Sequence, residues 1–169
     1  MTKTQQQYRN HNYFSDNVLS NMDKFVRDSR KALKDGPEFD TFVVRGMSGA
    51  IAGGILARSL DKHLWVIRKP DDSSHDSSRG FGTFGTKWMF LDDFVSTGNT
   101  FWRTYEGVEE SVIDRQVWDY ALRRYVDLTT ETEFVGAFLY AREGVVSRKA
   151  FQSILDSGFY GENPRQIGK

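Results

Sequence analysis

The stretch from Trp88 to Thr100 holds the residues whose types and spacing are best suited to chemistry. It opens with an uncharged bulky run, Trp88 to Leu91, which is typical of a strand buried on both faces. Two adjacent carboxylates, Asp92 and Asp93, follow directly, and a small hydroxyl-bearing turn and a helical pattern come next. A turn between a strand and a helix gathers free backbone N–H groups, so this order predicts an anion site that suits phosphate.

The acidic pair stands a few residues before this turn, at a distance that suits one sugar. Carboxylates there would accept hydrogen bonds from a ribose diol or hold magnesium through water. The pattern therefore predicts a site for a phosphorylated ribose, with Asp92 and Asp93 at the diol. A buried strand, a helix cap and two solvated acids would explain each residue but not their order. The residues that we expect at the 5-phosphate are Val95, Ser96, Thr97, Gly98, Asn99 and Thr100.

Two other segments have the same arrangement of a strand followed by an anion-binding turn. Residues 42–44 read as a strand, residues 45–49 as a glycine-bearing turn and residues 50–60 as a small-residue helix. The glycine spacing is not that of a dinucleotide-binding fingerprint. Arg68 and Lys69 follow a strand at 64–67, at the end where α/β proteins bind ligands. Pyrophosphate is the natural anion for these two cations. The alternative interpretation is a solvated basic pair that binds no ligand.

The periodicity of the chain predicts an α/β fold with a mainly parallel sheet flanked by helices. The strands are expected at 42–44, 64–67, 88–91 and 134–140, and helices at 18–33 and 50–60 and after Ser147. Asp16 is a candidate cap for the first helix, and Gly158 would end the last one. Residues 100–126 suggest two helices, a small helical insertion, and residues 71–85 suggest a long loop. All candidate segments then meet at the carboxyl edge of one sheet in a single domain, residues 1–169.

Composition excludes several classes of function. The chain has 169 residues with 23 basic and 23 acidic side chains, so no global basic field favours nucleic acid as a partner. It has no cysteine, which excludes disulfides, thiolate zinc sites and cysteine nucleophiles. No apolar run is long enough to span a membrane, and the polar start lacks a signal sequence. We therefore expect a soluble, cytoplasmic protein.

The segment LDDFVSTGNT, residues 91–100, resembles the PRPP-binding signature of the type I phosphoribosyltransferases. The resemblance implies that family's fold and a magnesium-dependent reaction in nucleotide metabolism or salvage. A nitrogen nucleophile, usually a nucleobase, would displace pyrophosphate from C1 of PRPP. The resemblance also implies a homodimer. Magnesium would be held mainly by PRPP, with Asp92 and Asp93 as contacts through water.

The resemblance assigns roles to the other segments. Residues 45–49 are similar to the family's pyrophosphate loop, which often holds a cis peptide, here at Arg45–Gly46 or Gly46–Met47. Residues 71–85 fall where the family has a mobile catalytic loop, and His75 and Arg79 are the residues best able to reach pyrophosphate. For His75 the alternative is an exposed loop histidine. The residues expected at pyrophosphate are Arg45, Gly46, Met47, Ser48, Gly49, Arg68 and Lys69, and the catalytic set is Asp92, Asp93, His75 and Arg79.

The acceptor base stays open. Ser96 and Asn99 stand where hypoxanthine-guanine enzymes carry an acid and a lysine, which counts against a 6-oxopurine. Orotate enzymes have a loop lysine soon after Arg-Lys, whereas the next lysine here is Lys87; the Arg68-Lys69-Pro70 sequence is similar to adenine enzymes. One alternative is a regulatory protein that binds PRPP or a nucleotide without catalysis. Another is an unrelated α/β nucleotide binder, although not a P-loop NTPase, since the P-loop motif is missing.

Overall fold

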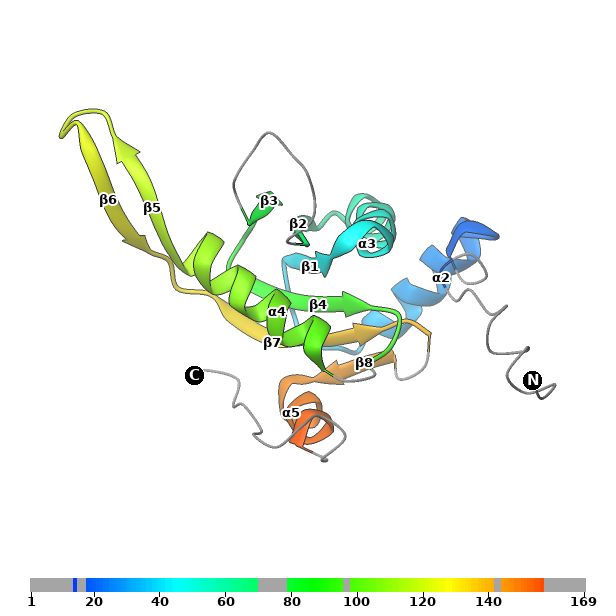
Figure 1. Cartoon of the computed structure of the whole chain (residues 1–169). Coiled ribbons are helices and arrows are strands. Elements are labelled where there is room, and N and C mark those ends of the chain that lie inside the picture. The colour runs from blue at the N-terminus through cyan, green and yellow to red at the C-terminus, as the bar shows by residue number, and fades with distance from the viewer. Residues whose placement is uncertain (1–13, 15–17, 70–78, 96–97, 142–143, 157–169) are drawn as a thin grey trace, which may run out of the picture.

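The computed structural model describes residue 14 and residues 18–69, 79–95, 98–141 and 144–156. A six-stranded sheet with the order β3-β2-β1-β4-β7-β8 forms its centre (Figure 1). The four inner strands are parallel, and the two edge strands pair antiparallel to their neighbours. This confirms the predicted α/β class with a mainly parallel sheet. The strands are β1 (Thr41–Arg45), β2 (His63–Ile67), β3 (Gly80–Gly82), β4 (Lys87–Asp92), β7 (Glu133–Leu139) and β8 (Gly144–Ser147).

Helices cover both faces of the sheet. On one face lie α2 (Met22–Leu33) and α3 (Gly46–Leu60), and on the other lie α4 (Asn99–Val108) and α5 (Arg148–Asp156). Trp88 and Phe90 of β4 pack on the α4 and α5 side, whereas Met89 and Leu91 pack on the α2 and α3 side. Two-sided burial explains why the β4 sequence is a continuous apolar run. Within the described ranges, no helix has the length and apolar character needed to cross a membrane.

Several element boundaries differ from the prediction. Helix α2 begins at Met22, and the side chain of Asn21 caps it by accepting a hydrogen bond from Lys24 N at 3.0 Å. The predicted cap Asp16 and the predicted helix end Gly158 both lie outside the described residues. Helix α3 begins at Gly46 rather than near residue 50, because Gly46 reverses the chain alone with a φ of +73°. Part of the predicted loop at 71–85 is strand β3, which pairs with β2.

The predicted second helix after residue 100 is wrong. A five-residue π-helical turn, η2 (Glu109–Ile113), follows α4, and the chain then forms an antiparallel hairpin of β5 (Asp114–Asp119) and β6 (Arg124–Thr129). Two of the apolar residues that suggested a helical face lie on the two strands of the hairpin instead: Val117 pairs with Val126, and Tyr125 pairs with Trp118. Valine, tryptophan and tyrosine favour strands, and Arg123, with a φ of +50°, completes the turn.

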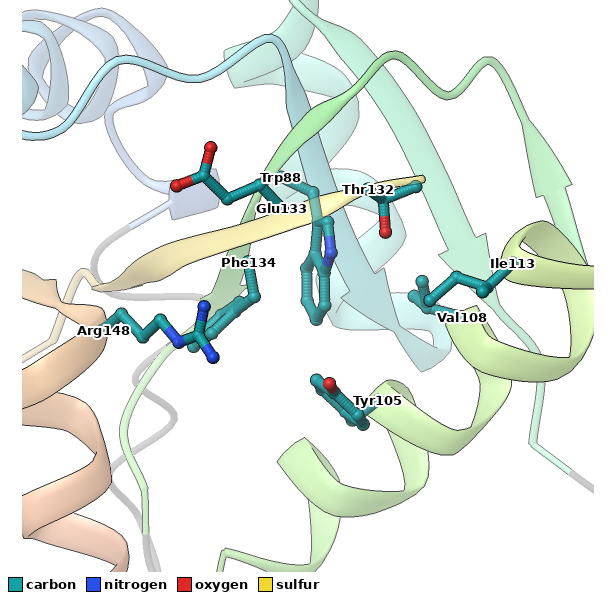
Figure 2. A pocket seen from close by; sticks show the side chains of 8 residues that line it. All are labelled: Trp88, Tyr105, Val108, Ile113, Thr132, Glu133, Phe134 and Arg148. Carbon is teal, nitrogen blue, oxygen red and sulfur yellow. The ribbon is translucent and has the colours of Figure 1, made fainter. Parts of the chain in front are cut away.

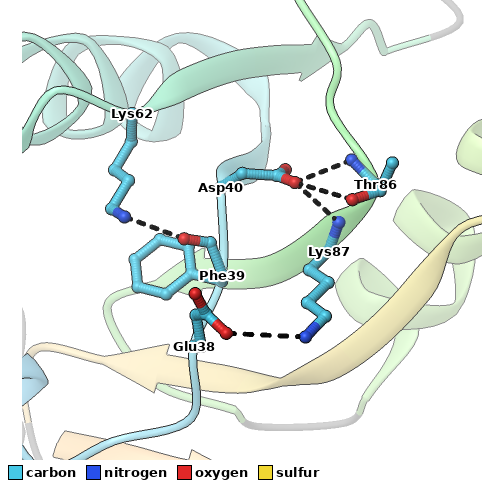
Figure 3. Close-up of polar contacts among 6 residues, drawn as sticks. All are labelled: Glu38, Phe39, Asp40, Lys62, Thr86 and Lys87. Atoms are coloured by element: carbon cyan, nitrogen blue, oxygen red, sulfur yellow. Dashed lines mark hydrogen bonds and ion pairs between the residues drawn. The ribbon is translucent and has the colours of Figure 1, made fainter.

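A carboxylate before β1 joins the amino ends of three strands (Figure 3). Asp40 accepts hydrogen bonds from Thr86 N at 2.8 Å, Thr86 Oγ1 at 3.0 Å and Lys87 N at 3.0 Å, and from Thr41 Oγ1 at 2.5 Å. Its own backbone carbonyl accepts from His63 N at 2.8 Å. Burial alone would raise the pKa of Asp40, but the hydrogen bonds from Thr41, Lys87 and Thr86 outweigh it and lower that pKa. Asp40 therefore fixes where β1, β2 and β4 start.

Replacing Asp40 by alanine is expected to lower the free energy of unfolding by about 2 to 4 kcal/mol, because backbone donors at Thr86 and Lys87 lose a charged acceptor. The contribution of Asp40 is present above the ordinary carboxyl pKa and disappears as pH falls through its lowered value. Urea unfolding at pH 7 measures the loss, with Asp35→Ala, at an exposed acid, as the matched control. Equal midpoints for the two variants would contradict this role.

Candidate functional site

Charged residues meet at the carboxyl edge of the sheet, where three neighbouring parallel strands end. Strand β1 ends at Arg45, β2 is followed by Arg68 and Lys69, and β4 ends at Asp92. Since β1 lies between β2 and β4, the cations and the acids share one edge. This edge is where open α/β sheets bind ligands.

The acidic pair is held by the backbone around it. Tyr140 N donates to the carbonyl of Asp92 at 3.1 Å, and Ala141 N donates to the carbonyl of Asp93 at 2.9 Å, so the chain beyond β4 stays paired with the chain beyond β7. Each carboxylate also accepts a backbone N–H from the following residue, Asp93 N to Asp92 at 3.0 Å and Phe94 N to Asp93 at 2.8 Å. These bonds orient both side chains before any ligand arrives.

The two carboxylates differ from ordinary surface acids. Burial, and next the charge of Asp93, raise the pKa of Asp92 to about 7. The positive charge of Lys69 and the hydrogen bond from the Asp93 amide act in the opposite direction. Near neutral pH Asp92 therefore gains or loses a proton easily, and a bound cation or diol would favour its charged form.

Lys69 lies against the turn between β1 and α3. A β-carbon on Gly46 would lie 2.8 Å from Cε and 3.4 Å from Nζ of Lys69. The absence of a side chain at Gly46 gives the lysine room to cross the start of α3 in this way. The ammonium group thus lies at the amino terminus of a 15-residue helix, which itself favours anions.

Arg45 adds a second cation on the same turn. Its Nε is buried and finds no hydrogen-bond acceptor among the residues that the structure describes. Burial, followed by the positive charges of Arg103 and Arg79, lowers the pKa of Arg45, while Glu106 acts in the opposite direction. Arg79 forms an ion pair with Glu110 at 2.8 Å. A buried donor beside further guanidinium groups is an arrangement that an oxyanion ligand would satisfy.

The predicted phosphate turn is described only in part, because Ser96 and Thr97 fall outside the described residues. Val95 packs its side chain against the core, which leaves its backbone for ligand contacts. Gly98 has a φ of +69° and is the N-cap of α4, and Asn99 and Thr100 are exposed in the first turn of that helix. The first N–H groups of a helix have no partner within the helix. Because α4 begins at Asn99, soon after β4 ends at Asp92, these groups lie at the same edge of the sheet as Asp92.

The remaining predicted residues are placed as follows. Met47 and Ser48 are exposed on the first turn of α3 and Gly49 is buried against Val44. Arg68 lies over the ring of Phe81 at 5.1 Å, and His75 is outside the described residues. The predicted cis peptide is wrong: the peptide bonds around Gly46 are trans, as are the others that the structure describes. The positive φ of Gly46 makes the reversal instead.

Sequence reasoning missed Tyr140, Glu106 and Glu110. Tyr140 directly follows β7, which pairs in parallel with β4. Its position at the carboxyl end of a parallel strand is the signal that could have placed it in the candidate site. Burial and the charges of Asp93 and Asp92 raise the pKa of Tyr140, so its hydroxyl stays protonated and can donate. Glu106 and Glu110 lie on a segment that was expected to be only structural, and no local motif marks them.

A groove of about 470 Å³ opens beside Tyr140, between α2 and the carboxyl end of β7. The Tyr140 ring packs edge-to-face on Phe25 of α2, with 5.3 Å between ring centroids. This volume is in the range of small-molecule sites. The groove is lined by Asn21, Lys24, Phe25, Asp28, Ser29, Ala32, Phe138, Tyr140, Ala141 and Gly144.

A smaller pocket of about 80 Å³ lies at the opposite, amino edge of β4 and β7 (Figure 2). Trp88, Tyr105 and Phe134 surround it with aromatic rings, and Arg148 reaches it from α5. The buried hydroxyl of Thr132 has no hydrogen-bond partner among the described residues. The pocket is too small for a sugar phosphate and is separated from the acids by the length of β4, so it is not part of the candidate site.

No protein-family model matches the sequence, and no curated protein matches it. Solved structures with a similar chain path do exist. One is orotate phosphoribosyltransferase from Aeropyrum pernix, with 14% identity, a TM-score of 0.48, and coverage of 72% of this chain and 60% of that one. Another is UMP synthase from Leishmania donovani, with 15% identity, a TM-score of 0.47, and coverage of 80% of this chain and 24% of that one. A third is adenine phosphoribosyltransferase from Thermoanaerobacter pseudethanolicus, with 21% identity, a TM-score of 0.43, and coverage of 74% of each chain. The matched region spans 60% of the length of the Aeropyrum pernix enzyme and 24% of the length of the UMP synthase.

Gly46→Ala is expected to lower the free energy of unfolding by about 1 to 2 kcal/mol, because alanine is strained at a φ of +73° and its β-carbon would meet Lys69. Gly54→Ala in the same helix is the matched control. A β-carbon there would meet nothing within 4 Å, so the better helix former should raise stability by up to about 1 kcal/mol. Thermal unfolding measures both, and a shift of the same sign in the two variants would contradict the close approach at Gly46.

Proposed function

We propose that this protein transfers a phosphoribosyl group from PRPP to a nitrogen nucleophile, with release of pyrophosphate. The observation that carries the proposal is the common edge that Asp92 and Asp93 share with Arg45, Lys69 and the amino terminus of α4. The sequence resemblance of residues 91–100 supports it. The names of the structural neighbours, orotate and adenine phosphoribosyltransferases, agree with it.

Each part of PRPP has a matching set of groups at this edge. The 5-phosphate would take the turn at 95–100, where free N–H groups begin α4. The ribose diol would donate to Asp92 and Asp93, and the pyrophosphate would lie between the first turn of α3, Lys69 and Arg45. Arg79 would leave Glu110 to contact the pyrophosphate, since the pair is an exposed one and therefore weak.

Magnesium fits the donor set at this edge. No group of three or more histidine, aspartate and glutamate side chains that could hold a metal occurs in the described part of the chain. Magnesium usually keeps several waters and binds through one or two carboxylates and substrate phosphates. Asp92 and Asp93 would therefore contact it through water, and PRPP would supply the direct ligands. When bound, the ion neutralises charge on the leaving pyrophosphate.

The reaction needs no covalent intermediate with the protein. The bond from C1 to the pyrophosphate oxygen breaks, and the bond from C1 to the acceptor nitrogen forms. The proton of the acceptor nitrogen passes to water or to the released pyrophosphate. Arg45 and Lys69 stabilise the departing pyrophosphate, and Asp92 and Asp93 hold the ribose in position. The groove beside Tyr140 is the proposed place for the acceptor ring, with the protonated Tyr140 hydroxyl as a donor.

Pyrophosphate release from PRPP and magnesium, measured across adenine, orotate, uracil, hypoxanthine and guanine, tests the proposal. Turnover with one base, together with the matching nucleotide as product, is the expected result. No turnover combined with heat stabilisation by PRPP would support the regulatory alternative instead. If PRPP gives no turnover and no heat stabilisation, the proposal of a PRPP site is rejected. Homodimers and cytoplasmic location remain proposals that derive from the sequence resemblance and composition.

A further inference from the structure

The hairpin of β5 and β6 is an arm that stands away from the rest of the molecule (Figure 1). The chain returns from it directly into the start of β7, so the arm is rooted near the amino edge of the sheet, away from the candidate site. Outside its own two strands, its main contacts are with η2. The tip of the arm, residues 119–125, can therefore reach a surface that the sheet and its helices do not touch.

Exposed apolar side chains gather at this tip. Tyr120 is 86% exposed, Tyr125 is 65% exposed and Leu122 is 56% exposed. Three of the eight large apolar side chains that are exposed in the described structure thus lie within six consecutive residues. A single exposed apolar residue is ordinary, whereas a cluster of them on a projecting element is typical of an interaction site.

Two arginines, Arg123 and Arg124, stand among these apolar residues. Both are exposed, and neither forms an ion pair within the described part of the chain. The one acid of the tip, Asp119, accepts hydrogen bonds from Ala121 N at 2.8 Å and Leu122 N at 2.9 Å, so its carboxylate holds the turn. With two arginines and one aspartate, the tip has a net charge of +1.

The backbone at Arg123 indicates that its side chain has a use. Its φ is +50°, a left-handed conformation that glycine or asparagine adopts more readily than arginine. Either of those residues would therefore serve the turn better. An unfavourable backbone conformation that keeps a cation at an exposed tip points to a role of that cation in binding.

We propose that the tip attaches the protein reversibly to the surface of a bilayer that contains anionic lipids. Each kind of side chain at the tip has a matching layer in such a surface. Leu122 would enter the boundary of the acyl chains, and the tyrosines have an apolar ring and a polar hydroxyl that suit the headgroup region. The two arginines would pair with lipid phosphates. The contact is with the surface of one leaflet and does not span the bilayer.

A nucleic acid fits the tip less well than a lipid surface. Binding to single strands combines stacked aromatic rings with a row of cations along the phosphates. This tip has only two arginines, and its leucine has no aromatic ring on which a base could stack. Attachment is independent of the proposed phosphoribosyl transfer, because the arm is rooted at the opposite edge of the sheet and the experiments need no PRPP.

Cosedimentation of the full chain with lipid vesicles tests the attachment. We expect binding to vesicles of phosphatidylcholine mixed with phosphatidylglycerol, weaker binding to phosphatidylcholine alone, and a decrease as salt rises. Leu122→Ser should weaken binding to the mixed vesicles about tenfold or more, because it removes the aliphatic group. Leu19→Ser makes the same change at a leucine that is 48% exposed outside the arm, and it should bind like the parent. A parent that binds neither kind of vesicle, or equal binding by the two variants, would overturn the proposal.

Removing the two cations tests the preference for anionic lipid. Arg123→Asn with Arg124→Gln keeps the turn, since asparagine tolerates a left-handed backbone, and should weaken binding to the mixed vesicles roughly tenfold or more. Arg27→Gln with Arg58→Gln removes two charges from exposed arginines of α2 and α3 and is the matched control. An equal loss in the two double variants would mean that the charge acts through the whole molecule, and it would overturn the role of the tip.

A fluorescent label locates the contact, because the natural chain has no cysteine. Leu122→Cys carrying a dye that is sensitive to its environment should shift its emission to the blue on the mixed vesicles. Leu19→Cys with the same dye should not. A shift at residue 19 without one at residue 122 would place the contact elsewhere and overturn the proposal. Binding of a single-stranded oligonucleotide by the tip, with no binding of vesicles, would assign the tip to nucleic acid and overturn it as well.

Discussion

The double variant Asp92→Asn with Asp93→Asn is expected to lose PRPP binding and keep its fold. Both side chains would still accept hydrogen bonds, so the local backbone contacts from Asp93 and Phe94 can persist. The charge that attracts the diol and the hydrated magnesium is gone. Hydrogen bonds to charged groups contribute about 1.5 to 3 kcal/mol each, which predicts a loss of affinity of roughly a hundredfold or more. Calorimetric titration with PRPP and magnesium measures it.

The matched control makes the same chemical change at two exposed acids outside the edge, Asp35→Asn with Asp61→Asn. Asp61 caps α3 with a φ of +53°, which asparagine tolerates, so this double variant should fold and bind PRPP as the parent does. Thermal unfolding of the site variant separates loss of binding from loss of structure. Parent-like affinity in the folded site variant would remove the acids from the site and with them the main support for the proposed function.

The parts of the fold that were predicted correctly have strong local signals. Strands β1, β2, β4 and β7 are apolar runs long enough to be buried on both faces, and helix α5 has Ser147 at its cap, where Ala150 N donates to Ser147 Oγ at 3.3 Å. Their order in the chain, strands alternating with helices, then requires a parallel sheet. The edge where Asp92 meets Lys69 follows from that topology.

The parts that were missed depend on contacts between distant residues. The spacing of Val117 and Tyr125 fits a helical face, but in the structure these residues lie on opposite strands of a hairpin, paired with Val126 and Trp118. The turn at Arg123, with its positive φ, separates the two strands. Strand β3 is three residues long and exists because β2 offers it an edge. Tyr140 became part of the site only because β7 lies beside β4. None of these is visible in a short window of sequence.

Asp92 is also expected to make the ligand-free protein less stable as pH rises from 4 to 8. Its pKa is raised to about 7 in the folded state and is near 4 in the unfolded chain, so between these values the folded state binds more protons. Stability is therefore highest below the unfolded value and falls as the proton is lost. Asp92→Asn removes the effect and should be more stable than the parent by about 2 to 4 kcal/mol at pH 8.

Urea unfolding of the parent and of Asp92→Asn at several pH values between 4 and 8 measures this difference directly. No PRPP is present, so the titration of its phosphate groups does not contribute to the result. The difference should be near zero at pH 4 and should grow until about pH 7. Asp35→Asn, at an exposed acid, is measured beside it as the matched control. A constant difference across the range would mean that Asp92 keeps an ordinary pKa. A growing difference would show that the fold tolerates an unfavourable charge at the position where a diol or a hydrated cation would stabilise it.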